Sequence, residues 1–234
     1  MHNSKIKQAF LAAVPYTIPI FAGFTFLGMA YGMYMNASGF SFWYPLFMSM
    51  AIYAGSVEFV GVSLLLAPFH PLNAFLMALM INARHLFYGI ALLERYQKLG
   101  WKRWYLIFGL CDETFSINYS AAIPEGIDSG WFFFFVTFLN QCYWGLGATL
   151  GGLFGHLLPF STKGIEFVMT ALFIVIFLEQ WNQETDHTSS YIGLLASLLS
   201  LLLFGAKNFM IPAMILILLM VSRLPNKQKG EQQL

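Results

Sequence analysis

Arg84 lies deep inside an apolar stretch of the sequence, between residues 72 and 93. The stretch has a suitable length for one bilayer crossing, which takes about 20 residues at a rise of about 1.5 Å each. A guanidinium group keeps its proton in proteins, so a charge at this depth needs a partner or a water-filled cavity. Asn82, His85 and Tyr88 cover a wide arc of the expected helix together with Arg84. Such an arc is typical of a helix at the centre of a bundle.

Three carboxyl groups also fall inside apolar segments, those of Glu58, Asp112 and Glu113. Each buried charge costs about 2.5–3.5 kcal/mol at a helix centre on the insertion scale, and Arg84 can neutralise only one of them. A buried carboxyl group without a cation tends to bind a proton, so all three are candidates for coupling transport to a proton gradient. A structural alternative is that Arg84 and Asp112 form a fixed pair that holds two helices together.

The composition indicates a membrane protein. Hydrophobic residues make up 58% of the 234 positions and charged residues 10%, and there are 25 phenylalanines. We therefore expect an all-α, polytopic helical bundle in the membrane, with lipid around it. A net charge of +1 without a dense basic run argues against nucleic acid as a partner. The two cysteines, Cys111 and Cys142, predict neither a disulfide framework nor a metal site.

Seven or eight hydrophobic segments are expected in one membrane domain, residues 1–234, with short polar tails at about 1–9 and 223–234. The segments cover about residues 10–35, 43–67, 72–93, 104–122, 131–154, 165–180, 191–205 and 209–222. The first carries Gly23, Gly28 and Gly32, whose spacing predicts close packing against another helix.

The charged loops give conflicting topologies. Residues 94–103 contain four Lys or Arg and should be cytoplasmic, and the acidic turn 124–128 suits the outside. Three full crossings before residue 94 would then place Lys5 and Lys7 outside, against the positive-inside tendency. Either the termini are external, or each half of the chain contains a segment that is broken or re-entrant. The interruption at Ala54 to Ser56 and the short pair around Gly205 are the candidates.

The sequence does not favour an enzyme. It contains no H-E-x-x-H, P-loop or G-x-S-x-G pattern, and Ser56 lacks the following glycine of an intramembrane serine protease. We expect no catalytic residues, no cofactor and no bound metal.

Several blocks of sequence resemble the AzlC family, the large subunits of bacterial branched-chain amino acid exporters. The resemblance covers roughly residues 10–220 and is most specific at N-x-R-H and D-E-T-F. The matching blocks are Pro15 with Phe21-x-x-Phe24 and Gly28, then 53–59 (YAGSVEF), 82–89 (NARHLFYG), 112–115 (DETF) and 170–173 (TALF). Glu58 departs from the glutamine that we expect in many members.

The resemblance implies a multi-pass exporter of leucine, valine, isoleucine or their analogues in the bacterial cytoplasmic (inner) membrane. It also implies a partner, a small hydrophobic subunit of the AzlD type. An amino acid carboxylate could bind Arg84 or the N-terminus of a broken helix, and its ammonium group could bind Asp112 or Glu113. The expected substrate site lies between the second, third and fourth segments. Its candidate residues are Arg84, Asn82, His85, Tyr88, Asp112, Glu113, Ser56 and Glu58.

Two other functions remain open at this point. The chain could be a channel or an exporter for another small molecule. It could also be a membrane scaffold or assembly subunit whose buried charges only hold helices together. Replacing a whole buried ion pair by apolar residues is often neutral, so a scaffold would tolerate joint removal of Arg84 and Asp112.

Overall fold

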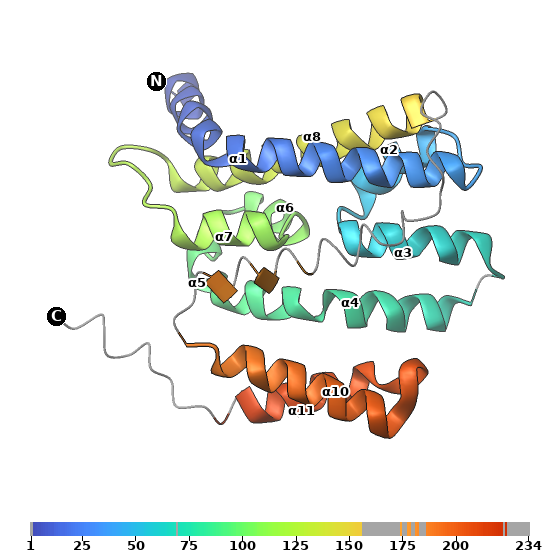
Figure 1. The fold of residues 1–234 in the computed structure, drawn as a ribbon. Helices are drawn as coiled ribbons and strands as arrows, with labels where there is room; N and C mark the ends of the chain where they lie inside the picture. The colour runs from blue at the N-terminus through green and yellow to red at the C-terminus, as the bar shows by residue number, and fades with distance from the viewer. Residues whose placement is uncertain are drawn as a thin grey trace. The chain divides into compact units, whose positions relative to one another are not determined.

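The computed structural model describes residues 2–68, 70–155, 174, 177–178, 181–182, 186–221 and 223. The elements in these ranges are helices, which confirms the all-α expectation (Figure 1). They are α1 (His2–Ala37), α2 (Trp43–Ala51), α3 (Gly55–Leu66), α4 (Pro71–Ala91), α5 (Leu93–Tyr96), α6 (Lys102–Phe108), α7 (Asp112–Ser120), α8 (Ser129–Phe154), α10 (Thr188–Asn208) and α11 (Met210–Val221). The chain divides into two compact units, Met1–Met169 and Thr170–Leu234. The expected segment 165–180 lies almost wholly outside the described residues, and a single membrane domain stays a prediction.

Helices α1 and α8 lie side by side in the first unit and run in the same direction (Figure 1). Near their beginnings Phe10 contacts Phe135, with ring centroids 5.2 Å apart. Near their ends the Asn36 side-chain amide donates to the carbonyl oxygen of Gly152 at 3.2 Å. Two long helices can be parallel neighbours only if the chain between them returns to the end from which it started.

Glycines allow the backbones of α1 and α8 to touch. A Cβ atom on Gly28 would lie 2.7 Å from the carbonyl oxygen of Trp144, and one on Gly32 would meet the backbone of Ala148 and Gly152. The predicted close packing is therefore confirmed at Gly28 and Gly32. It is wrong at Gly23, where an added Cβ would have no neighbour within 4 Å in the part of the chain that the structure describes.

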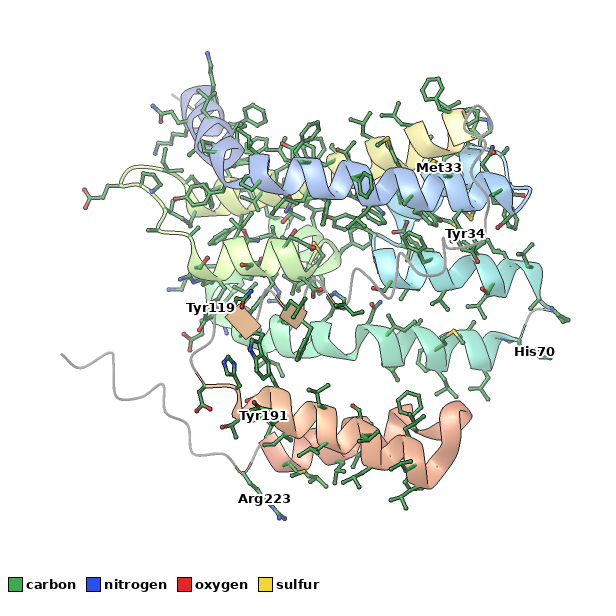
Figure 2. The ribbon with its side chains drawn as sticks, viewed as in Figure 1. Met33, Tyr34, His70, Tyr119, Tyr191 and Arg223 are labelled. Carbon is green, nitrogen blue, oxygen red and sulfur yellow. The ribbon has the colours of Figure 1, made fainter. Side chains whose placement is uncertain are left out.

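Helices α2 and α3 form a hairpin, which we call hairpin A (residues 43–66). The chain between them, Ile52 to Ala54, is not helical, which confirms the interruption predicted near Ala54. Tyr31 of α1 contacts both arms, because its hydroxyl group donates to the Met48 sulfur at 3.4 Å and its ring lies 5.4 Å from that of Phe59. Tyr34, labelled in Figure 2, also stacks on Phe59.

Helices α6 and α7 form a second hairpin, hairpin B (residues 102–120), which the sequence did not reveal. Its break covers Gly109 to Cys111. The beginning of α6 lies at the beginning of α8, where Lys102 is 3.9 Å from Asp128. The end of α7 returns there too, because Tyr16 donates to the Ala122 carbonyl oxygen at 3.2 Å and its ring lies 5.4 Å from that of Phe132.

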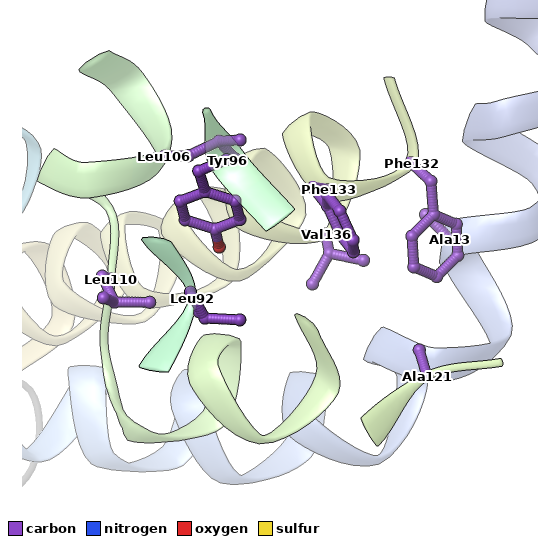
Figure 3. Close-up of a cluster of buried hydrophobic side chains, with 9 residues drawn as sticks. All are labelled: Ala13, Leu92, Tyr96, Leu106, Leu110, Ala121, Phe132, Phe133 and Val136. Carbon is purple, nitrogen blue, oxygen red and sulfur yellow. The ribbon is translucent and has the colours of Figure 1, made fainter. Parts of the chain in front are cut away.

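A buried apolar cluster holds this end of the first unit together (Figure 3). Figure 3 shows Leu92 and Tyr96 beside Leu106, with Phe132 and Phe133 of α8 completing the cluster. The basic segment 94–103 and the acidic turn 124–128 therefore lie at the same end, and the expectation of opposite sides is wrong. Segment 104–122 enters the unit and returns instead of crossing it.

Hairpin A enters from the opposite end. Phe42 and Pro45, at the beginning of α2, pack near Gly152 toward the end of α8. Deeper in the unit, the Gln141 side chain donates to the carbonyl oxygen of Met50 at 3.1 Å. Helix α4 then runs back from hairpin A to hairpin B, where the rings of Tyr88 and Phe115 stack with centroids 4.3 Å apart. The two hairpins thus approach each other tip to tip.

Helices α10 and α11 form the described part of the second unit and pack against each other. Gly205 has φ 70° and ψ 168°, values that interrupt the helix within α10. A glycine tolerates a positive φ that other residues rarely adopt. The predicted interruption around Gly205 is confirmed.

Large apolar side chains are exposed over both units, among them Phe26 (65%) and Leu202 (74%). Surfaces of this kind are typical of proteins surrounded by lipid. Within the described residues, two helices are long and apolar enough by themselves to span a membrane, Lys5–Ala37 and Thr188–Gly205.

Candidate functional site

The tips of the two hairpins meet beside the middle of α8. The Tyr53 hydroxyl group lies 3.7 Å from the Cys111 sulfur, and each residue belongs to the break of its own hairpin. Tyr53 has φ 47°, a left-handed conformation that costs a residue with a side chain about 1–2 kcal/mol. Strain of this size persists where the surroundings hold the chain in place, and it occurs often at functional sites.

One face of α8 supports both tips. Thr137, Asn140, Gln141 and Trp144 lie on it at helical spacing, and all are buried. The Gln141 side chain bridges the hairpins, because it donates to the Met50 carbonyl oxygen of hairpin A and accepts from the Tyr105 hydroxyl group of hairpin B at 2.6 Å. Irregular backbone at membrane depth requires such partners, because lipid offers none.

Glu58 lies in the first turn of α3 and is completely buried. Its carboxyl group accepts a hydrogen bond from the Ala54 backbone N–H at 3.0 Å, and the single indole N–H of Trp144 points at both of its oxygens in a bifurcated contact, at 3.1 and 3.0 Å. A carboxylate in the first turn is also favoured by the helix dipole. Glu58 thus closes the beginning of α3 and attaches it to α8, which gives this carboxylate a structural role in addition to any role in coupling.

Hairpin B has the corresponding contact at Thr114, in the first turn of α7. The Asn140 side-chain amide donates to the Thr114 hydroxyl oxygen at 3.1 Å, and the Cys111 sulfur lies 3.1 Å from the same oxygen. Asn140 and Trp144 are one helical turn apart on α8. Each broken helix is therefore attached to α8 through the first turn of its second half, so the two hairpins are held in matching ways from opposite ends.

The predicted polar arc of α4 reaches α7 at Tyr88. Tyr88 stacks on Phe115, and the His85 ring lies edge-on to Tyr88 with centroids 5.6 Å apart. His85 Nδ1 donates to the Asn82 carbonyl oxygen at 3.2 Å in the tautomer that carries its proton there. His85, Asn82 and Tyr88 are half-buried, so this part of α4 is neither a sealed core nor a fully exposed surface.

Three of the other predicted site residues lie at the hairpin tips, and the side chain of the fourth is not described by the structure. Ser56, Asp112 and Glu113 are half-buried in the first turns of α3 and α7. Arg84 belongs to α4 by its backbone, but its side chain lies outside the described part of the structure. The Arg84–Asp112 pair stays a prediction. The structure thus places Ser56, Glu58, Asp112 and Glu113 on the two half-helices that begin where the tips meet.

Sequence reasoning assigned no role to several residues that connect the tips. Tyr53, Thr114 and Trp144 are ordinary residues for an apolar segment and give no signal in one sequence. Asn140 and Gln141 do give one, because two adjacent amides inside an apolar helix need hydrogen-bond partners in a membrane. The structure supplies these partners at the two breaks.

Comparisons with known proteins agree on one family. The model of the family described as AzlC protein matches residues 19–158. The chain is 58% identical to the branched-chain amino acid transport protein AzlC of Bacillus subtilis over 92% of its length and 85% of that protein. It is 53% identical to an uncharacterized membrane protein of Haemophilus influenzae, over 92% and 88% of the two lengths. The inner membrane protein YgaZ of Escherichia coli is 27% identical, over 90% and 86%. No solved structure shows a significant match.

Proposed function

Because the chain belongs to the AzlC family, we propose that it is a secondary transporter of branched-chain amino acids in the bacterial cytoplasmic membrane. The name of the Bacillus subtilis relative, a branched-chain amino acid transport protein, supports the substrate class. The observation that carries the mechanism is the meeting of hairpins A and B at Tyr53 and Cys111. Discontinuous helices that meet near the bilayer midplane are where many secondary transporters bind substrate and coupling ions.

The orientation in the membrane follows from the direction of the helices. Helix α1 is long and apolar enough to cross the membrane by itself. We assign α4 and α8 as further crossings because of their length, since even the 21 residues of α4 span about 32 Å. Hairpins A and B then enter from opposite faces and return. This arrangement places Lys5 and Lys7 on the same face as the basic segment 94–103, which is the cytoplasmic face by the positive-inside tendency. In this arrangement the basic residues at the beginning of α1 and after α4 lie on one face, so the charged loops of the first unit no longer predict conflicting topologies.

Helix α1 with hairpin A and helix α4 with hairpin B form two similar halves of opposite orientation. Inverted repeats of this kind allow a carrier to alternate between outward-open and inward-open states by rocking one half against the other. Helix α8 contacts both tips, so we expect it to stay in place while the two halves move relative to it. The substrate site belongs between the tips and the polar part of α4.

The substrate's charged groups have candidate partners there. Arg84, or the N-terminal end of α3 or α7, would bind the carboxylate, since helix N-termini favour anions. Asp112 or Glu113 would bind the ammonium group. The stacked rings of Tyr88 and Phe115 offer an apolar wall for a branched side chain. This combination suits a small zwitterion with an apolar side chain.

We also propose a direction of transport, a coupling ion and a partner subunit. Transport proceeds outward, so that the protein protects the cell from excess or toxic analogues. A proton is coupled to transport through Glu58, Asp112 or Glu113. A small AzlD-type membrane subunit assembles with the chain and is required for full activity.

Efflux of labelled leucine, valine and isoleucine from cells tests the function, with and without the small subunit. Arg84→Ala should abolish efflux while the protein remains in the membrane. Arg84→Leu combined with Asp112→Leu separates a transporter from a scaffold, because a scaffold would tolerate the double change and a transporter would not. The proposal would be contradicted if cells that produce the protein released all three amino acids no faster than cells that lack it. Counterflow in vesicles separates a carrier from a channel.

A further inference from the structure

The two helix breaks differ in how their polar groups are satisfied. At the break of hairpin A, Gln141 donates to the Met50 carbonyl oxygen, and Glu58 accepts from the Ala54 N–H. Trp144 then satisfies the Glu58 carboxylate. Protein groups therefore supply both donors and acceptors at this break.

The break of hairpin B presents acceptors. The helical ladder of α6 ends with the Gly109 N–H donating to the Tyr105 carbonyl oxygen, and it restarts with the Phe115 N–H donating to Cys111. The carbonyl groups that follow Tyr105 lie at the end of a helix, where they have no donor from a following turn. The end of a helix also carries a partial negative charge. The α6 side of this break therefore favours a positively charged ligand, whereas the N-terminus of α7 on its other side favours an anion.

Asn140 adds a further acceptor. Its side chain is completely buried and donates through Nδ2 to the Thr114 hydroxyl oxygen. Among the residues that the structure describes, no hydrogen-bond partner is found for its Oδ1 atom. Buried polar atoms in native proteins almost always have a partner, which here would have to be a water molecule or a bound ligand.

Asn140 lies beside the break. One turn before it on α8, the Thr137 side chain occupies the space where a Cβ atom on Gly109 would be. On its other side, Asn140 contacts Thr114, and Thr114 contacts Cys111 at the edge of the break. The Asn140 side chain thus lies against the first turn of α7, one turn along α8 from the residue that packs against Gly109 at the end of α6.

We propose that Asn140 Oδ1, the Thr114 hydroxyl oxygen and the carbonyl end of α6 bind a sodium ion. All three are neutral oxygen ligands, which suit a hard monovalent cation. Unwound carbonyls and the ends of half-helices hold sodium in other transporters. No cluster of three or more His, Cys, Asp or Glu that could bind a multivalent metal occurs in the described part of the chain.

The degree of burial favours an ion over the substrate at this position. Thr114 and Asn140 are both 0% exposed, and they lie in a packed interface between α7 and α8. An ion that has lost its water fits such an interface, whereas a whole amino acid needs a cavity. The ion would tie hairpin B to α8, so its binding would depend on the position of the hairpin. This role deepens the proposed transport function, but sodium binding itself can be measured without transport.

Thermal unfolding of the purified protein in detergent tests the site, in NaCl, KCl and choline chloride at equal ionic strength. We expect a saturable rise of several degrees in Tm that is specific for sodium. Asn140→Leu and Thr114→Val should reduce the apparent sodium affinity at least about tenfold, because each removes one ligand. Asn140→Asp keeps the oxygen and adds charge, so it should retain or increase the affinity. Binding of radioactive sodium provides the second readout.

Thr137→Val is the matched control. Thr137 is buried on the same face of α8, but its hydroxyl group donates to the Phe133 carbonyl oxygen of its own helix. This variant should keep the sodium response of the parent. If Asn140→Leu does not fold, Asn140→Asp and Thr114→Val still test the site.

Two results would overturn the proposal. Equal Tm values in all three salts, with no radioactive sodium bound, would mean that a water molecule satisfies Asn140. A rise in Tm with leucine that needs no sodium and is lost in Asn140→Leu would assign the oxygen to the substrate's ammonium group. Failure of amino acid efflux together with a sodium-specific rise would reject the transport function and leave the ion site intact.

Discussion

The indole N–H of Trp144 lies within hydrogen-bond distance of both carboxylate oxygens of Glu58, at 3.1 and 3.0 Å. The ring of Trp144 also stacks on Tyr31 of α1, with centroids 6.2 Å apart. One side chain of α8 therefore joins hairpin A to both long helices that enclose it. Its loss should loosen the tip of hairpin A before it disturbs the rest of the unit.

Trp144→Phe should destabilise the protein by about 0.5–3 kcal/mol, the range for a hydrogen bond to a neutral or a charged carboxyl group. A phenyl ring preserves most of the stacking but has no donor for the Glu58 carboxylate. Thermal unfolding in detergent measures the loss, expected as a decrease of several degrees in Tm. Trp104→Phe is the matched control, because Trp104 is 70% exposed. Equal Tm values for the two variants would show that the indole hydrogen bond contributes nothing.

Glu58→Gln and Glu58→Leu should behave differently. A glutamine side-chain oxygen can accept from both Ala54 and Trp144, as Glu58 Oε1 does, so Glu58→Gln should unfold close to the parent Tm. Leucine leaves both donors buried without an acceptor, at a cost of about 1–3 kcal/mol each. Efflux then separates the roles of Glu58, since Glu58→Gln removes a titrating group. If Glu58 couples a proton, leucine efflux by Glu58→Gln should lose its response to an imposed pH gradient.

Gln141 and Tyr105 should be energetically coupled, because Gln141 bridges the hairpins. Gln141→Leu removes the donor to Met50 and the acceptor of Tyr105, whereas Tyr105→Phe removes only one hydrogen bond. We expect the double variant to be less destabilised than the sum of the single variants, by about 0.5–1.5 kcal/mol. Denaturation of the four proteins in detergent gives this coupling energy. Strict additivity would mean that the 2.6 Å contact is not maintained in solution.

From the sequence, a broken helix in hairpin A is one of two explanations for the conflicting loop charges, because Gly55 and Ser56 lie in the middle of an apolar run. The sequence did not predict the break at Gly109 to Cys111. Gly109 is a single glycine, and single glycines are common in membrane helices that do not break. Thr137 packs against Gly109 at this break from a different helix. Long-range packing of this kind leaves no local pattern.

The candidate site was predicted in part for a similar reason. A charged residue inside an apolar run is easily recognised in a sequence, so Glu58, Asp112 and Glu113 could be selected from the sequence alone. The hydrogen-bond partner of Glu58 could not, because Trp144 looks like a packing residue until the direction of α8 relative to hairpin A is known. The positions of Lys102 and Asp128 show the same dependence, since only the return of hairpin B brings them to one end.

Gly32→Ala should destabilise the crossing of α1 and α8 much more than Gly23→Ala. The added methyl group at residue 32 would meet the backbone of Ala148 and Gly152, which cannot rotate away. Overpacking of this kind costs about 1–3 kcal/mol. At residue 23 the methyl group has open space, and alanine has the higher helix propensity. Yield after extraction and Tm in detergent measure both variants, and equal losses would contradict the close approach at Gly32.

Cysteine labelling in intact cells tests the assigned topology, with Cys111 and Cys142 in the parent protein as the background. Lys98→Cys and Glu125→Cys lie in exposed segments at the beginning of α8, and Ala37→Cys lies at the opposite end of α1. We expect a membrane-impermeant maleimide to label residue 37 from outside and to reach residues 98 and 125 only after the cells are opened. The informative position is residue 125, because a fourth segment that crossed the membrane would place it outside despite the basic loop before it. Labelling of residue 125 in intact cells, with residue 98 protected, would show that α6 and α7 cross the membrane instead of returning. It would also remove hairpin B as the counterpart of hairpin A, because both the inverted repeat and the meeting of the two tips require the chain to turn back at Gly109.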